Sequence, residues 1–572
     1  MEKAIFRLGW VSEDSIIPFF LGCIVFVMSK NRFRQTWADE LAVTLTGRKG
    51  ICQFATAFCY SFFTCLGYLR ELYVGSPLRI LFDLATTFMG LFFLFMIFIS
   101  YAYDLMGSAW YRRRKDDKKH PAGPVSLKNL LIYTAVIFIC YIPLFLRFYP
   151  GSFGADSINQ IRQAMHLTPY TNHLPVLSTW LIELFYDLGF SATGNVNAAL
   201  AFYTVFQMLI TACTYAFCVC YLQSRGTGKL FSFIILAVFA LTPMITMYAI
   251  YIHKDTPAAD LLLLLIIFLH FIVTLDRGDE KKTGRVTAAL FMILSILFML
   301  FRSNHFYVYA GLLVCAAFAI KNLRKTVLIL MCICILISAL FKGPVLKSMD
   351  IQGADAAETL SMPLVMISYT LSAGGDVSDR ERSVIEKIIS CDRLAESYSL
   401  TSANPVKRAV RYEGDLAYLT EHKGEFMSVF ISVFMKNPAA CTIALVDHSK
   451  GYYCPKFTYP ELILGTWENE FGAFTDQKLP DPLGQKVYEL TQLAYDKYEK
   501  YLGCAMSFWL ILFLMFYAIY RKKSFLPYMP PVGIVATFLL ASPNVGRFRY
   551  QYPVMVAAIL LTGLTFLSDE KL

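Results

Sequence analysis

Long apolar runs separated by short polar loops dominate the chain. A helix needs about 20 mainly apolar residues to cross a bilayer, and runs near that length recur along the 572 residues. The pattern therefore predicts an all-α, multi-pass membrane protein with about 13 spans. The runs lie at residues 10–29, 51–69, 77–103, 129–148, 196–222, 229–251, 256–275, 286–303, 305–320, 325–341, 505–520, 525–541 and 553–569.

Basic residues in the connecting loops predict the orientation of these spans. They concentrate at residues 30–49, 112–119, 225–229, 277–285, 321–325 and 521–523, and such loops are typically cytoplasmic. This rule holds along the whole chain only if residues 155–190 form two membrane-surface helices instead of a span. The run at 174–188 is short and carries Glu183 and Asp187, which favours surface helices.

With this orientation, the remaining polar segments gather on the extracytoplasmic face and the C-terminus is cytoplasmic. We expect an N-terminal three-helix membrane portion (1–125), a transmembrane core (126–341) with an outer loop at 148–195, an extracytoplasmic domain (342–504) and a C-terminal three-helix portion (505–572). The domain at 342–504 is predicted to be mostly α-helical, because residues 378–397 and 483–502 place apolar side chains at helical spacing.

Composition agrees with a membrane protein and excludes one class of partner. Only 16% of the residues are charged, whereas soluble proteins contain about 25%. The formal charge of +10 arises from the basic loops and not from a basic face with exposed aromatic residues, so we expect no nucleic acid. Most of the 15 cysteines lie in apolar runs and predict core packing; whether Cys391, Cys441, Cys454 and Cys504 form disulfides stays open.

Asp156 is the first candidate for chemistry, because it follows Gly154 at the predicted start of a helix in the outer loop. One interpretation is a helix N-cap, and Ser157 with Gln160 fits a capping box. The other is a catalytic base that deprotonates an acceptor hydroxyl. The two roles are compatible, since a carboxylate at a helix start can still face a bound molecule.

The turn His253-Lys254-Asp255-Thr256-Pro257 is the second candidate. Lys254 alone fits a lipid headgroup contact, and Asp255 fits a cap for the following helix. Charged residues between two apolar helices are costly unless they reach headgroups or a cavity. Asp260, just inside the next apolar run, strengthens the functional interpretation because an intramembrane carboxylate needs a partner.

A third candidate, Arg547-Phe548-Arg549-Tyr550, precedes the last span. Arginine and tyrosine favour the membrane interface as simple anchors, but guanidinium groups also bind phosphate with matched geometry. Three side chains from other outer turns would complete a cationic pocket: Lys254, Arg302 and His305.

Two more outer residues are candidate substrate contacts. His173 shares the outer loop with Asp156, and Trp467 adjoins Glu468 and Glu470 in the polar domain. An aromatic platform beside carboxylates suits sugar hydroxyls, although a buried tryptophan in a folded domain explains the same pattern.

Together these segments resemble the GT-C superfamily of polyprenyl-phosphate-sugar-dependent glycosyltransferases, over about residues 129–341 and 505–569. Asp156 matches the acidic residue of the family's first outer loop. Asp255 matches the second-loop acidic position, which in many members helps to hold a divalent metal. The segment 549–553, Arg-Tyr-Gln-Tyr-Pro, is similar to the motif near the lipid phosphate. Many members have paired acids where this chain has Asp156 followed by Ser157.

The resemblance implies a GT-C-like helical bundle and an inverting glycosyltransferase. It would move a sugar from a polyprenyl-phosphate donor to a cell-surface glycan, lipid or protein on the extracytoplasmic face, with no directly bound nucleotide cofactor. Asp156 would be the base, and Asp255 with His253 would be ligands of a divalent metal such as Mg²⁺ or Mn²⁺. The candidate substrate-binding residues are Lys254, Arg302, His305, Arg547, Arg549, Tyr550, His173 and Trp467.

Two other functions fit a multi-pass protein. A secondary transporter or lipid flippase would show related halves, broken helices and ionisable residues near the membrane midplane. Here the charges cluster at helix ends on one face, and a large polar region follows the tenth predicted span, which favours the transferase. A non-catalytic assembly protein is the third possibility, and it would tolerate Asp156→Asn.

Overall fold

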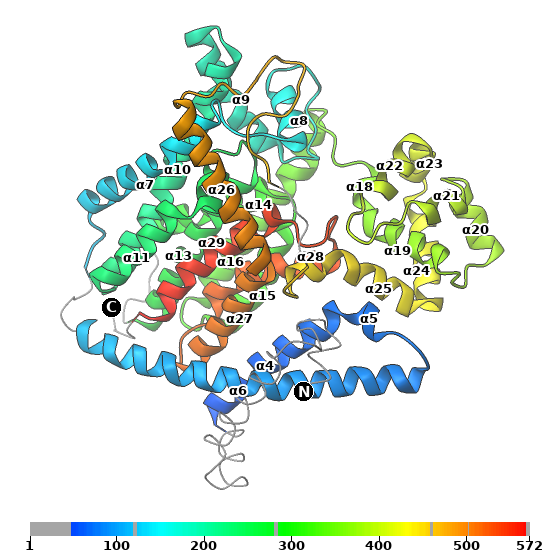
Figure 1. Ribbon diagram of the computed structural model, residues 1–572, viewed down its shortest axis with the longest axis horizontal. Coiled ribbons are helices and arrows are strands. Elements are labelled where there is room, and N and C mark those ends of the chain that lie inside the picture. Colours follow the sequence, from blue (N-terminus) through cyan, green and yellow to red (C-terminus); the bar gives the residue numbers. More distant parts are fainter. Residues whose placement is uncertain (1–46, 118–122, 279–283, 458–461, 502, 568–572) are drawn as a thin grey trace.

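A computed structural model describes residues 47–117, 123–278, 284–457, 462–501 and 503–567 (Figure 1). Within these residues the chain is all-α, and its only β structure consists of isolated bridges. The predicted span at 10–29 lies outside the described residues. Every other predicted span corresponds to one or two helices.

Among the described residues, six helical segments are long and apolar enough to cross a membrane, or up to eight if two bent pairs each count as a span. The chain is therefore a multi-pass helical membrane protein. The six are α4 (Arg48–Gly67), α6 (Pro77–Asp117, apolar to Ser108), α7 (Leu127–Arg147), α10 (Val196–Ser224), α13 (Asp255–Arg277) and the segment Arg324–Ser348, which comprises α16 (Arg324–Leu340), η1 (Phe341–Val345) and α17 (Leu346–Ser348). The bent pairs are α11 (Lys229–Leu241) with α12 (Pro243–Ala249), at 57°, and α24 (Lys423–Lys436) with residues 438–452, at 106°.

This number is smaller than the predicted number of spans because several apolar runs form shorter helices. They are α14 (Arg285–Phe301), α15 (His305–Ala319), α27 (Ala505–Tyr520) and η3 (Leu526–Tyr528) continuing into α28 (Met529–Leu540). The last helix, α29 (Phe548–Thr565), has 18 residues and is also not among the candidate spans. A helix rises about 1.5 Å per residue, so the 15 residues of α15 cover less than the roughly 30 Å of a bilayer core. The predicted span at 229–251 bends where Pro243 follows Thr242, as expected at proline.

The centre of the bundle is formed by α10, α13 and α29, with α7 and α27 packed around them (Figure 1). Small residues allow close approach between membrane helices. At Gly563 of α29, an added Cβ would lie only 2.4 Å from Leu222 of α10. A larger residue at position 563 would therefore push these helices apart.

The N-terminal helices form a hairpin beside this bundle. The helices α4 and α6 pack on each other, and α4 also packs on α27, with the short α5 (Leu69–Leu72) at the tip. Arg70 of α5 forms an ion pair with the buried carboxylate of Asp447 and donates to the Tyr398 hydroxyl. The hairpin is thereby joined to the polar domain as well as to the membrane bundle.

The polar domain is helical, as predicted; most of it, from α18 to α24, lies to one side of the bundle, whereas its last helix packs on α7 and α12 of the bundle (Figure 1). Residues 378–397 form two helices in place of the predicted one, with α20 starting at a Ser378–Glu381 capping box. Cys391, Cys441, Cys454 and Cys504 are buried and form no disulfide with one another. The helices are α18 (Ala356–Thr359), α19 (Ser361–Ser372), α20 (Asp379–Glu386), α21 (Cys391–Glu396), α22 (Asn404–Tyr412), α23 (Leu416–Glu421), α24, α25 (Pro438–Ser449), η2 (Lys450–Tyr452) and α26 (Asp481–Tyr501).

Two backbone contacts, here called the clasps, hold the polar domain to two loops of the bundle. In the first, Thr171 and Gln352 form a parallel bridge, and the Asn172 N–H donates to the Gln352 carbonyl at 2.7 Å. In the second, Ser402 and Asn544 form an antiparallel bridge, and the Ser402 hydroxyl donates to the Asn544 side chain at 2.6 Å. The domain thus contacts both the loop after Asp156 and the loop before Arg549.

Candidate functional site

Three chain segments meet where the candidate residues lie. Ser152 forms a parallel bridge with Tyr251, and Phe153 forms one with Thr466. Gly151 precedes this junction at φ +136°, and a Cβ there would lie 2.6 Å from the Thr204 hydroxyl. The position therefore requires glycine. The junction places the start of α8 (Ala155–Ala164) next to the turn at 253–255.

Asp156 lies in the first turn of α8 and faces three cationic or imidazole groups. Its Oδ2 is 2.8 Å from Arg549 Nη1, 3.7 Å from His253 Nε2 and 3.8 Å from Lys254 Nζ. The predicted N-cap role is wrong, because Gly154 occupies the N-cap and no side chain caps the helix. The carboxylate is instead held by residues from two other parts of the chain.

The predicted capping box after Asp156 is also absent. The Ser157 hydroxyl has no hydrogen-bond partner among the described residues. Gln160 donates instead to the Ser178 hydroxyl of the next helix, α9 (Val176–Thr193), at 2.7 Å. Gln160 therefore joins the two predicted surface helices, which the structure shows as separate helices packed on each other.

Asp255 begins α13 and is fully buried. Its Oδ1 lies 3.0 Å from Arg302 Nη1, and its Oδ2 lies 2.9 Å from His253 Nδ1. His253 therefore stands between the two carboxylates of the site. The Tyr550 ring lies 5.2 Å from the Arg302 guanidinium, and its hydroxyl accepts a 2.8 Å hydrogen bond from Arg549 Nη2.

Electrostatics favour an ionised Asp156 and a lysine that titrates near physiological pH. Burial alone would raise the pKa of Asp156, but Arg549, His253 and Lys254 hold it well below the ordinary value. Burial lowers the pKa of Lys254 to about 8, although Asp156 and Asp255 oppose that shift. Lys254, Arg302 and Arg549 face two carboxylates, so the cluster has one excess positive charge when His253 is neutral.

The predicted metal at Asp255 and His253 does not fit these residues. Both carboxylate oxygens of Asp255 already lie beside Arg302 or His253. In the part of the chain that the structure describes, no group of three or more His, Cys, Asp or Glu side chains could hold a metal ion. Cations surround the carboxylates where a metal would need further anionic or neutral donors.

Four other predicted substrate contacts lie apart from the ion pairs of Asp156. His305 is buried and stacks on Phe298, with ring centroids 4.1 Å apart. Arg547 donates its backbone N–H to the Tyr452 hydroxyl at 3.3 Å. Trp467 lies at the start of α8, where a Cβ on Gly154 would be 3.5 Å from its ring.

His173 is the fourth of these residues, and it lies between the site and the polar domain. Its side chain is exposed. Desolvation lowers the pKa of His173 and Lys254 lowers it further, whereas Glu358 and Asp156 oppose the shift. Glu358 belongs to α18 of the polar domain, so this histidine is influenced by charges from both regions.

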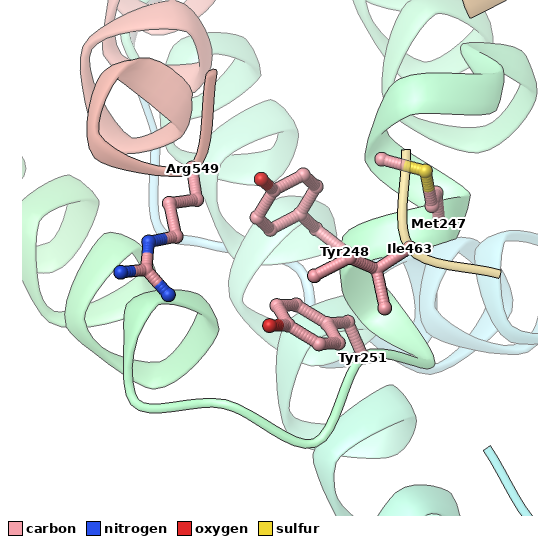
Figure 2. A pocket seen from close by; sticks show the side chains of 5 residues that line it. All are labelled: Met247, Tyr248, Tyr251, Ile463 and Arg549. Carbon is pink, nitrogen blue, oxygen red and sulfur yellow. The ribbon is translucent and has the colours of Figure 1, made fainter. Parts of the chain in front are cut away.

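Sequence reasoning missed two tyrosines of the site, Tyr248 and Tyr251. With Met247, Ile463 and Arg549 they line a small pocket with room for about one water molecule (Figure 2). The Tyr251 ring stacks on the His253 ring at a centroid distance of 5.0 Å and an angle of 7°. In the sequence, the position of Tyr251 two residues before His253 could have indicated that it belongs to the site. That signal was hidden because Tyr251 lies at the end of an apolar run.

Comparison with known proteins places most of this site in one family. Residues 164–571 match DUF6020, described as a family of unknown function. No curated protein and no solved structure matches the chain. His253, Asp255 and Arg549 lie within the matched residues, whereas Asp156 and the N-terminal hairpin precede them. Because the match covers well over half of the 572 residues, the chain belongs to the DUF6020 family.

Proposed function

We propose that this protein is an inverting, GT-C-type membrane glycosyltransferase. It moves a sugar from a polyprenyl-phosphate donor to a cell-surface glycan, lipid or protein on the extracytoplasmic face. The observation that supports this proposal is the contact of Asp156 with Arg549 at 2.8 Å, next to Lys254, Arg302 and His253. The site combines a carboxylate that can accept a proton with an excess of positive charge.

Each part of the transfer has a candidate group. Asp156 Oδ2 takes the proton from the acceptor hydroxyl, whose oxygen attacks the anomeric carbon of the sugar. The bond between that carbon and the phosphate oxygen breaks, and the electron pair leaves with the polyprenyl phosphate. Arg549 and Lys254 stabilise the negative charge of the leaving phosphate. Direct attack inverts the configuration at the anomeric carbon.

The ion pair with Arg549 also links donor binding to the strength of the base. In the free protein the guanidinium stabilises the Asp156 carboxylate and makes it a weak base. A donor phosphate beside Arg549 offsets that positive charge, so the carboxylate becomes more basic. Asp156 is then most reactive when the donor is in place. Arg302 and Arg549 supply positive charge without a metal, and no step is assigned to one.

The surrounding helices suit a lipid-linked donor and a polar acceptor. Both α13 and α29 start at the site, with Asp255 and Phe548 as their first residues, so a polyprenyl chain would follow these apolar helices into the bilayer. We assign α8 and α9 to the membrane surface and the C-terminus to the cytoplasm. His173 and Trp467, on the side of the polar domain, are assigned to the acceptor.

A flippase or secondary transporter remains the second candidate, because of two features of the bundle. The pair α11 and α12 is bent by 57°, as in the broken helices of transporters. In addition, α13 buries Asp260, whose Oδ2 accepts a 2.8 Å hydrogen bond from Thr211. Intramembrane carboxylates often mark proton or ion pathways.

The deciding experiment is sugar transfer by the purified full chain in lipid nanodiscs, with a panel of defined polyprenyl-phosphate sugars. Wild-type protein should transfer at least one sugar, and Asp156→Asn should lower kcat by about 10³-fold, within the range for loss of a general base. Glu413→Gln is the matched control, because this exposed carboxylate pairs with Arg393 in the polar domain. Full turnover by Asp156→Asn would refute the assigned base. Donor movement across the bilayer without transfer would favour the flippase.

A further inference from the structure

Two buried hydrogen-bond donors that border the small pocket of Figure 2 have no acceptor among the described residues. Arg549 and Tyr251 form its polar side, and Met247 and Ile463 close its apolar side. Both tyrosine hydroxyls in the pocket point toward the side where the Arg549 guanidinium lies. The pocket has room for about one oxygen-sized group.

The two terminal nitrogens of Arg549 contact other side chains of the protein, whereas its Nε does not. Nη1 contacts Asp156 at 2.8 Å, and Nη2 donates to the Tyr550 hydroxyl at 2.8 Å. Nε has no partner among the described residues, although only 6% of Arg549 is exposed. Such a group is rare, because nearly all buried polar groups in proteins are hydrogen-bonded.

The Tyr251 hydroxyl is the second such group. It lacks a hydrogen-bond partner within the described part of the chain, and only 3% of the residue is exposed. The ring is fixed by its stack on His253 and by the backbone bridge to Ser152. The hydroxyl therefore has a defined position, reached without further ordering of the side chain.

Ser157 is the neighbour that could satisfy Tyr251 internally. Its hydroxyl acts on the Tyr251 hydroxyl through a weak hydrogen-bond interaction, but neither hydroxyl makes a well-formed hydrogen bond within the described residues. A bond between them would still leave Arg549 Nε without an acceptor. The excess positive charge of the cluster further favours an oxygen that carries negative charge.

We propose that Tyr251 is a further substrate-positioning residue, and that its hydroxyl and Arg549 Nε together bind one phosphoryl oxygen of the donor. This inference rests on the proposed function and adds a residue to it. Tyr251 and Arg549 border the same small pocket, and Met247 and Ile463 close its other side. The contact fixes the phosphate while the other nitrogens of Arg549 stay with Asp156 and Tyr550.

The test is Tyr251→Phe, which removes one oxygen atom and keeps the ring on His253. We expect KM for the donor to rise about tenfold, as for loss of a hydrogen bond to a charged group, with kcat little changed. Product inhibition by polyprenyl phosphate should weaken by the same factor. Tyr517→Phe is the matched control, because its hydroxyl is also buried without a hydrogen-bond partner in the described part of the chain. It lies in α27 beside Tyr103 and Phe513, so the substitution should leave KM unchanged.

Two outcomes would overturn the inference while leaving the proposed function intact. One is an unchanged donor KM in Tyr251→Phe when wild-type protein transfers sugar. The other is an equal rise in KM for Ser157→Ala, which would assign the Tyr251 hydroxyl to an internal bond. Failure of wild-type protein with every donor would instead refute the proposed function. Direct binding of polyprenyl phosphate to wild type and Tyr251→Phe would then decide whether the phosphoryl contact exists.

Discussion

The molecule contains two clusters of charged side chains that look alike in composition and differ in how completely they are paired. One is the site cluster of Asp156, Lys254, Asp255, Arg302 and Arg549. The other, here called the domain cluster, joins α18 and α22 of the polar domain. Its members are Asp355, Glu358, Lys407 and Arg411.

In the domain cluster the charged groups satisfy one another. Lys407 Nζ lies 2.9 and 3.0 Å from the two Glu358 oxygens, and Arg411 binds Asp355 through two nitrogens at 2.7 and 3.0 Å. Asp355 also accepts from the Glu358 N–H and caps α18. Two cations balance two carboxylates, and none of these side chains carries a buried atom without a partner.

The site cluster has the opposite character. Its cations outnumber its carboxylates, and Arg549 Nε lacks a hydrogen-bond partner among the described residues. The comparison teaches that charge and burial alone do not mark a functional site. Incomplete pairing does, because polar groups that are not satisfied within the protein remain for a ligand.

The largest expected effect comes from removing one partner of the fully buried pair. Arg302→Met leaves the Asp255 carboxylate without its guanidinium, which should lower the free energy of unfolding by about 3 kcal/mol. Thermal unfolding of the purified protein in lipid measures the loss. Arg393→Met, which breaks an exposed pair with Glu413, should cause no measurable change. Equal unfolding temperatures for both variants would contradict the importance of burial.

Arg549→Lys should be the next largest change, and it acts on transfer. Lysine keeps the charge but cannot reach Asp156, Tyr550 and the pocket at once, so we expect kcat/KM to fall about 10²-fold. Initial rates with the best donor measure it. Arg411→Lys, in the domain cluster, should leave the rate unchanged. Similar losses in both variants would remove the distinction between the clusters.

The lowered pKa of Lys254 predicts a pH dependence. Its ammonium is present below about pH 8 and is lost above it, so kcat/KM should fall about tenfold for each pH unit above 8. Asp156 and Asp255 raise that pKa, whereas Arg302 and Arg549 lower it. In Lys254→Arg the decline should disappear, since arginine stays charged. A decline at the same pH in that variant would assign it to another group.

The smallest expected effect is in the domain cluster. Arg411→Met removes partly exposed pairs with Asp355 and Glu358, and should cost about 1 kcal/mol of stability. Transfer per folded molecule should stay at the wild-type level. Unfolding and initial rates measured on the same preparation would separate the two quantities. A loss of transfer without a loss of stability would place the domain cluster in the site.

Much of the fold could be predicted because apolar runs and loop charges are local signals. Each apolar run among the described residues became helical, but sequence alone did not reveal where helices end early. The bend after Thr242 had a signal in Pro243, and it was hidden by the apolar residues on both sides. The number of apolar runs therefore overestimates the number of helices that are long enough to cross the membrane.

The meeting of Asp156 with residues 253–255, Arg302 and Arg549 was also predictable, since all were assigned to one face of the membrane. Which of these side chains would pair with each other could not be predicted. The sequence carries no sign that Asp255 would contact Arg302 and His253 closely, an arrangement that does not fit the predicted metal. Nor does it show that His305 would stack on Phe298. Such choices depend on backbone junctions such as Ser152 with Tyr251.

The two clasps have a consequence for engineering chimeras within the family. Replacing the polar domain by that of a relative would have to preserve main-chain pairing at Gln352 and at Ser402, because each contacts a loop next to a site residue. A graft that matched only the ends of the domain would leave both loops without their partners. Chimeras whose exchange points separate Thr171 from Gln352, or Ser402 from Asn544, should therefore fold poorly. Chimeras that take both residues of each pair from the same parent should remain folded.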